Sequence, residues 1–226
     1  DPKDPDRREA YANALLDKGI AWEAQRQARK VVELAPDSAE THRLLGTLLT
    51  FDAVGRRFQN GYDFRGARES LKRAVELEPE RMEFHFLLGE TLSYDQYGNH
   101  YPEETLVEAT EHLQKAFESA PFHAGVGLNL ALLLWHQQSD DELKKLLPKL
   151  RLNQTSQFLM LALGAAENPR AAADRVTRTW QAANHQSAVA ENVAVLLSSI
   201  REYDKGLKFL EALPKSAVDA PLERHI

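Results

Sequence analysis

Two stretches of this chain carry the same pattern, and that repetition constrains the fold more than any other feature of the sequence. Residues 44–79 and 87–121 both contain a Leu-Gly pair, an aromatic-Asp-x-x-Gly motif, a second aromatic residue, two spaced alanines and a closing proline. The prolines that close successive units, Pro36, Pro79 and Pro121, lie 43 and 42 residues apart. Self-similarity at a period of this length is the signature of a repeat architecture, in which each unit packs on its neighbours.

Each unit consists of two stretches with helical periodicity, joined by a loop. Apolar residues recur about every three to four positions on both sides of the loop, as on one face of an amphipathic helix. Gly46 and Gly89 are small where the first helix must approach its partner, and Ala67 and Ala109 are small on the second helix for the same reason. The closing prolines stop the second helix, because proline cannot continue the hydrogen-bond ladder.

The repeats predict an all-α fold, a right-handed α-solenoid of about six antiparallel helix pairs. We expect a single domain over residues 1–226, without an internal linker. Clear repeats cover about residues 5–150, with loop inserts at about 51–62 and 94–104. Degenerate helix pairs follow at about 155–214, before a short C-terminal tail.

Candidate helix starts agree with this register. Thr105 with Glu108, and Ser139 with Glu142, have the spacing of a capping box, in which two side chains satisfy free N–H groups at a helix start. Asp63 stands at the equivalent place one repeat before Thr105. We therefore expect second helices to begin directly after these residues.

The pattern of large and small residues resembles the tetratricopeptide repeat (TPR) family, whose units of about 34 residues each form a helix pair. The resemblance implies a superhelical array that binds a protein or peptide segment on its concave face. Compared with that period, the two units contain about 9 and 8 extra residues between their helices. Units with this insert resemble the TPR regions attached to some bacterial transglutaminase-like proteins. That likeness covers residues 44–121 and transfers no catalytic residue, because the chain contains no cysteine.

The two inserts repeat one motif, and it has two interpretations. The motif residues are Phe51, Asp52, Gly55 and Phe58 in the first insert, and Tyr94, Asp95, Gly98 and Tyr101 in the second. In the structural interpretation, which we favour, the Asp accepts backbone N–H bonds in a turn, the Gly supplies a positive φ and the second aromatic residue covers a helix end. In the functional interpretation, the aromatic and carboxylate groups of both inserts contact a ligand.

The face formed by the first helices is the predicted partner-binding groove, because the TPR resemblance places ligands there. Its residues are Glu40, Arg43, Glu83, Phe86, Glu90, Leu128, Leu132 and Trp135. The groove begins acidic and polar and becomes apolar, which predicts a partner with basic and apolar groups. The helix over residues 125–136 is apolar nearly all round. Either later helices cover its remaining faces or it forms the floor of the groove.

Catalytic chemistry is not predicted. The chain has no catalytic sequence motif, so we expect no catalytic residue, no metal site and no cofactor. His42 and His85 occupy the same repeat position and are expected to pack between helices, whereas His112 is expected on a helix surface beside Glu108.

Composition limits the partners. A net charge of −6 disfavours nucleic-acid binding, and the longest apolar stretches are too short for a membrane span. Two alternatives to a peptide-binding scaffold remain open: a regulatory or substrate-positioning arm of a larger enzyme, and self-assembly into a homo-oligomer. The chain begins with Asp1, so we expect it to be a segment or a processed product. The composition is compatible with the cytoplasm and with the periplasm.

Overall fold

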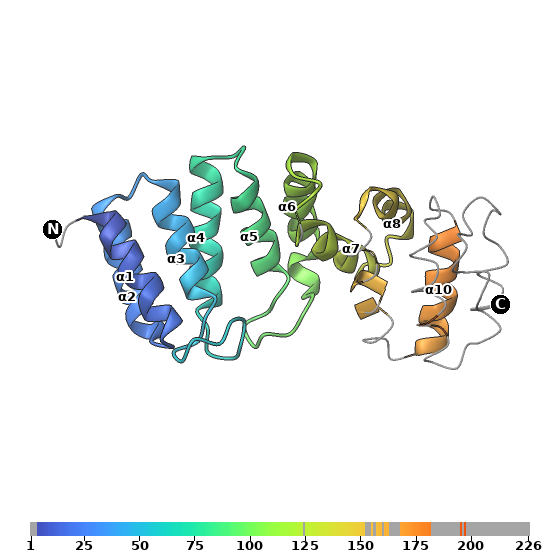
Figure 1. The fold of residues 1–226 in the computed structure, drawn as a ribbon, viewed down its shortest axis with the longest axis horizontal. Helices are drawn as coiled ribbons and strands as arrows, with labels where there is room; N and C mark the ends of the chain where they lie inside the picture. The colour runs from blue at the N-terminus through green and yellow to red at the C-terminus, as the bar shows by residue number, and fades with distance from the viewer. Residues whose placement is uncertain are drawn as a thin grey trace. The chain divides into compact units, whose positions relative to one another are not determined.

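The computed structural model describes residues 4–123, 125–151, 155, 157–159, 161–162, 168–181, 195 and 197. These residues form helices and loops, with two isolated antiparallel bridges, so the predicted all-α fold is confirmed (Figure 1). The chain divides into two compact units, residues 1–120 and 121–226. The single domain expected from the sequence stays a prediction.

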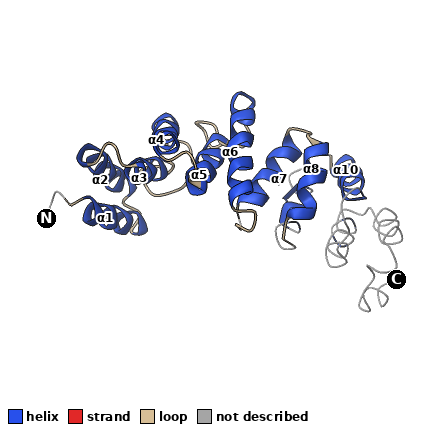
Figure 2. Ribbon diagram, turned by 90° about the horizontal axis from the view of Figure 1, so that it is seen from above, coloured by secondary structure: helices blue, strands red, loops and turns tan. Residues whose placement is uncertain are grey.

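The first unit, here called unit 1, contains three helix pairs in its described residues. The pairs are α1 (Pro5–Asp17) with α2 (Ala21–Leu34), α3 (Ala39–Leu49) with α4 (Phe64–Leu77), and α5 (Met82–Leu92) with α6 (Leu106–Ser119), the last preceded by a 3₁₀ turn η1 (Glu103–Thr105). Figure 2 shows the pairs following one another in chain order. In Figure 1, the α1–α2 turn and both inserts lie at the same edge of this unit.

Small residues allow close contact within each pair, as the repeat pattern predicts. A Cβ atom on Gly46 would lie 2.6 Å from Leu71 Cγ, and a Cβ atom on Gly89 would lie 2.8 Å from Leu113 Cγ. Both leucines are fully buried, so neither has room to move away. Ala67 and Ala109, the small residues of the second helices, are also fully buried.

The closing prolines end the second helices where predicted. α2, α4 and α6 each end two residues before Pro36, Pro79 and Pro121. The residue that precedes each proline has left the helical conformation, with φ between −134° and −143°, because the proline ring disfavours the helical region at that position.

Two of the predicted caps begin helices without making the predicted hydrogen bond. Thr105 and Ser139 precede α6 and α8, but neither side chain caps its helix, so the capping-box prediction is wrong in its chemistry. Thr105 Oγ1 instead donates to the carbonyl of Leu92, at the end of α5, over 2.7 Å. Asp63 does cap α4, accepting from the N–H of Gly66 at 3.0 Å.

The second unit, unit 2, contains α7 (Val126–His136), α8 (Asp140–Leu146), a 3₁₀ turn η2 (Leu147–Lys149) and α10 (Pro169–Gln181). α8 contacts both α7 and α10. Asn168 caps α10, because its Oδ1 accepts from the N–H of Ala171 at 3.1 Å. The last predicted helix pair, residues 193–214, lies outside the described residues apart from 195 and 197.

Candidate functional site

The two inserts form the same hydrogen-bonded turn. In each, one carboxylate oxygen of the motif Asp accepts from the backbone N–H groups two and four residues later, over 2.8–3.1 Å. The other oxygen binds the side chain four residues later, which is Arg56 in the first insert and Asn99 in the second. Hydrogen bonds from Arg56, first from its backbone, hold the pKa of Asp52 below its usual range. Burial raises the pKa of Asp95, but hydrogen bonds from Asn99, Tyr97 and Gly98 lower it by more.

The glycine and the second aromatic residue complete this turn. Gly55 and Gly98 have φ of 86° and 85°, in the region that favours glycine. Phe58 and Tyr101 also have positive φ, and each returns its N–H to a carbonyl at the end of the preceding helix, over 2.8 and 2.7 Å. These bonds satisfy carbonyls that a helix end leaves without a partner. The geometry supports the structural interpretation of the motif, since both carboxylates are fully used within their own turns.

The two inserts also pack on each other. Phe58 stacks on Tyr94 with ring centroids 4.0 Å apart and planes 10° apart. Tyr62 Oη donates to the carbonyl of Asp95 at 2.7 Å, and Arg68 donates to the carbonyl of Tyr94 at 2.6 Å. Burial raises the pKa of Tyr62 to about 12, so its hydroxyl remains a donor at neutral pH. We call these two packed inserts the insert stack.

Glu90, one of the predicted groove residues, forms an ion pair with the insert stack. Arg57 donates to both carboxylate oxygens of Glu90, over 3.2 and 2.6 Å, and its guanidinium lies 4.6 Å from the centre of the Phe58 ring. A bidentate pair of this kind is strong and directional. Glu90 therefore contributes little free negative charge to the first-helix face.

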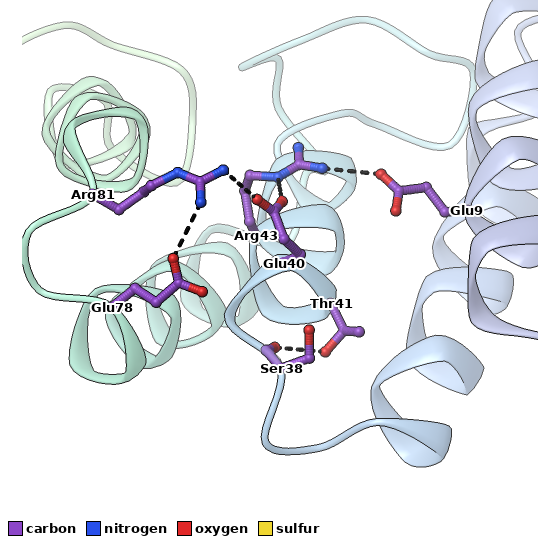
Figure 3. Close-up of polar contacts among 7 residues, drawn as sticks. All are labelled: Glu9, Ser38, Glu40, Thr41, Arg43, Glu78 and Arg81. Atoms are coloured by element: carbon purple, nitrogen blue, oxygen red, sulfur yellow. Dashed lines mark hydrogen bonds and ion pairs between the residues drawn. The ribbon is translucent and has the colours of Figure 1, made fainter.

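A chain of ion pairs crosses the first-helix face of unit 1 (Figure 3). Arg43 on α3 binds Glu9 on α1 at 3.0 Å and also binds Glu40. Arg81, at the start of α5, binds Glu40 at 2.7 Å and Glu78 at 3.2 Å. The chain thus joins all three helix pairs.

Negative charge exceeds positive charge on this face. Glu83 is exposed, and its charge acts on Arg43. Burial lowers the pKa of Arg43, but the hydrogen bond to Glu40 and the charges of Glu40, Glu9 and Glu83 raise it by more. Glu9, Glu40 and Glu83 accompany Arg43 and Arg81, so three glutamates stand against two arginines. The face therefore carries a net negative charge even though its arginines are paired.

The histidines make an inter-helix contact that the sequence did not reveal. His42 Nε2 and His85 Nε2 each donate to a proline carbonyl, Pro36 or Pro79, at 2.8 Å. His85 Nδ1 also lies 2.7 Å from Nδ1 of His112, so the expectation of a solvent-exposed His112 paired with Glu108 is wrong. Glu108 instead binds Lys72 at 2.7 Å. Burial, followed by the charge of His85, lowers the pKa of His112 to about 4.

The apolar residues predicted for the groove lie in unit 2, on α7. Leu128, Leu132 and Trp135 are each partly buried. The Arg175 guanidinium of α10 lies 3.9 Å from the centre of the Trp135 ring, and Phe158 meets that ring edge-on at 5.9 Å. Later helical residues therefore cover part of α7, as one of the two interpretations of this helix expected.

Solved structures identify the fold. YrrB, described as a TPR protein with an unusual peptide-binding site, matches with a TM-score of 0.51 at 17% identity, over 99% of this chain and 91% of that chain. PilF of Pseudomonas aeruginosa matches with a TM-score of 0.55 at 16% identity, over 98% and 96%. A thermophilic TPR protein of Thermus thermophilus matches with a TM-score of 0.50 at 16% identity, over 98% and 96%. The chain has the TPR fold.

The sequence itself has no match that would add to the fold. No protein-family model matches it, and no curated protein matches it. None of the comparisons tests the likeness of the inserts to transglutaminase-linked TPR regions, which stays a prediction.

The predicted TPR groove divides between the two units. Glu40, Arg43, Glu83, Phe86 and Glu90 belong to unit 1, whereas the three α7 residues belong to unit 2. The sequence did not reveal the ion pairs that these residues form with Glu9, Arg57 and Arg81, because such pairs depend on side-chain directions across helices. In the described part of the chain, no three His, Asp or Glu side chains converge as a metal site would require. None of the described helices has both the length and the apolar character needed to cross a bilayer.

Proposed function

We propose that this TPR chain is a noncatalytic scaffold whose first-helix face binds a protein or peptide segment with basic and apolar groups. The observation that carries the proposal is the excess negative charge of that face in unit 1, where Glu83 is exposed beside an ion-pair chain in which Glu9 and Glu40 bind Arg43 and Arg81. Phe86 lies one helical turn after Glu83 on α5 and is partly exposed. It supplies an apolar contact within reach of the acidic group.

Two further observations support this function. YrrB has the same fold and is described as having a peptide-binding site, so the architecture is compatible with peptide recognition. In unit 2, the partly exposed Leu128, Leu132 and Trp135 offer apolar contact on a first helix. An extended segment or amphipathic helix with cationic side chains is the partner type that such surfaces accept.

Selection from a phage-displayed library of random peptides on the intact chain tests the proposal. We expect the enriched clones to combine Lys or Arg with apolar residues. Their affinity should fall about fivefold or more for Glu83→Lys and about tenfold for Phe86→Ala. Leu128→Asp and Trp135→Ala report on the α7 residues in the same way.

Glu118→Lys is the matched control, because Glu118 is an exposed glutamate on the second helix α6. Its binding should equal that of the unmodified chain. Clones that bind Glu83→Lys and Phe86→Ala as tightly as the unmodified chain would remove the first-helix face of unit 1 from consideration.

A further inference from the structure

Large apolar side chains are exposed along the edge of unit 1 that carries the inserts. Val54 and Tyr97 occupy the same position in the two inserts, directly before the motif glycine, and are 63% and 60% exposed. Ile20 and Trp22, at the α1–α2 turn and the start of α2, are 38% and 58% exposed. We call these four residues the insert-edge patch. Ile20, Val54 and Tyr97 belong to the three loops that Figure 1 shows at one edge of the unit, and Trp22 belongs to the first turn of α2.

Direct contacts join these loops. A Cβ atom on Gly19, in the α1–α2 turn, would lie 3.7 Å from the carbonyl oxygen of Val54, and one on Gly55 would lie 3.4 Å from Gly19 Cα. A Cβ atom on Gly98 would overlap the carbonyl oxygen of Phe58. Each loop therefore touches the next through a glycine, which places the three loops at this edge next to one another.

The exposed surface of the two insert tips, residues 51–61 and 94–101, is nearly free of charge, and the exposed Glu103 and Glu104 follow the second tip. Within residues 51–61 and 94–101, the exposed residues are Ala53, Val54, Arg56, Gln59, Asn60, Gly61, Gln96, Tyr97, Asn99 and His100. Arg56 is the one permanent charge among them, and it is paired with Asp52 at 2.7 Å. Depletion of charge together with exposed aromatic residues is the composition that distinguishes the centre of a protein interface from ordinary surface.

Contacts within the chain also fix the conformation of the insert edge in the absence of a partner. The motif aspartates, the stacked Phe58 and Tyr94 rings and the Tyr62 hydrogen bond fix the backbone that carries Val54 and Tyr97. A surface that is already ordered loses little conformational entropy on binding. This rigidity favours recognition of a partner and distinguishes the two tips from ordinary mobile loops.

We propose that the insert-edge patch is a second docking surface, which binds an uncharged, aromatic-rich segment of another protein. The occupant is matched by charge. The insert tips carry no unpaired charge, and the exposed Asp17 and Lys18 at the adjoining α1–α2 turn cancel in net charge, so a strongly charged segment would lose hydration without gaining a net ionic attraction. The first-helix face of unit 1 is acidic and selects the opposite kind of segment. One chain can thus hold two chemically different segments at once.

Selection from a phage-displayed library of random peptides, in about 1 M salt so that charge interactions are screened, tests this proposal on the intact chain. We expect clones rich in Trp, Tyr and Leu and poor in Lys, Arg, Asp and Glu. Their affinity should change less than about twofold between about 0.1 and 1 M salt. It should fall about tenfold or more for Tyr97→Asp or Val54→Asp.

Matched variants separate this surface from the first-helix face. Glu83→Lys should leave the affinity of these clones unchanged, and Tyr97→Ser keeps the test valid if Tyr97→Asp fails to fold. Clones that bind the Tyr97 and Val54 variants at full strength, or a selection that yields no clones, would overturn the proposal. Binding to neutral phosphatidylcholine vesicles that is lost in Tyr97→Asp would also overturn it, since the patch would then contact lipid.

Discussion

The two inserts share a backbone turn, but they carry different residues between the motif glycine and the second aromatic residue. In the first insert these are Arg56 and Arg57, of which one closes the Asp52 turn and the other reaches Glu90 on α5. In the second insert they are Asn99, which closes the turn through its amide, and His100, whose ring packs 4.4 Å from Tyr94. The Asp, the Gly and the second aromatic residue are thus sufficient for the loop shape. The two intervening residues give each loop contacts that the other loop lacks.

The largest expected difference between the inserts is at the motif glycines. Gly55 and Gly98 have nearly the same φ, so Gly→Ala adds the same backbone strain at both, about 1–2 kcal/mol. At Gly98 the new methyl group would also overlap the Phe58 carbonyl oxygen, which adds roughly 1–3 kcal/mol. Urea denaturation should therefore show a clearly larger loss of unfolding free energy for Gly98→Ala than for Gly55→Ala. Equal losses would show that the inserts do not pack together.

Removing the turn carboxylates should produce the next largest effect. Asp52→Ala leaves two backbone N–H groups and Arg56 without their acceptor, whereas Asp95→Ala leaves two N–H groups and a neutral amide. Because bonds to a charged donor are stronger, Asp52→Ala should lower the melting temperature more, by roughly 5 °C or more. Thermal melts followed by circular dichroism measure both variants, with the exposed Asp17→Ala as control. A larger shift for Asp95→Ala would contradict this ranking.

The histidine contacts should make unit 1 sensitive to acid. The pKa of His112 is about 4 in the folded chain and 6.5 when unperturbed, so the unfolded chain binds the extra proton first. The contribution of His112 to stability is complete above pH 6.5 and is lost as the pH falls toward 4. Because the ring is only partly buried, we expect a loss of roughly 1–2 kcal/mol.

His112→Ser tests this dependence, since the preceding repeat has Ser70 at the equivalent position beside His42. The unfolding free energy of this variant, measured from about pH 7.5 to 4.5, should fall less steeply than that of the unmodified chain. Parallel pH profiles would exclude His112 as the titrating group.

The smallest expected effect concerns the arginine that only the first insert has. A double-mutant cycle with Arg57→His and Glu90→Gln should give a coupling of roughly 0.5–1.5 kcal/mol, typical of a partly buried bidentate pair. Arg57→His gives the first insert the residue that the second insert has at this position. A coupling near zero would mean that the pair adds nothing to the stability of the loop contact.

Local features of this fold and the close packing within each helix pair were predictable from the sequence, and polar side-chain contacts between helices were not. The Asp turn, the positive φ of Gly98 and the end of α4 before Pro79 depend on neighbouring residues, so the repeated pattern reveals them. The link between His85 and His112 and the pairing of Arg57 with Glu90 depend on side-chain directions across different helices. The patch residues Val54 and Tyr97 were missed for another reason. They occupy a position where the two repeats have different residues, so a search for residues common to both repeats passes over it.

The insert stack also changes how this unit should come apart. A simple repeat array loses structure piecewise from its ends, because each pair is held only by its immediate neighbour. Here the loop edge gives neighbouring pairs a second shared interface, through the Phe58–Tyr94 stack and the Tyr62 bond. Stronger coupling between neighbours raises the cost of a boundary between folded and unfolded pairs. Unit 1 should therefore melt as one cooperative block, with uniform hydrogen-exchange protection from α3 to α6.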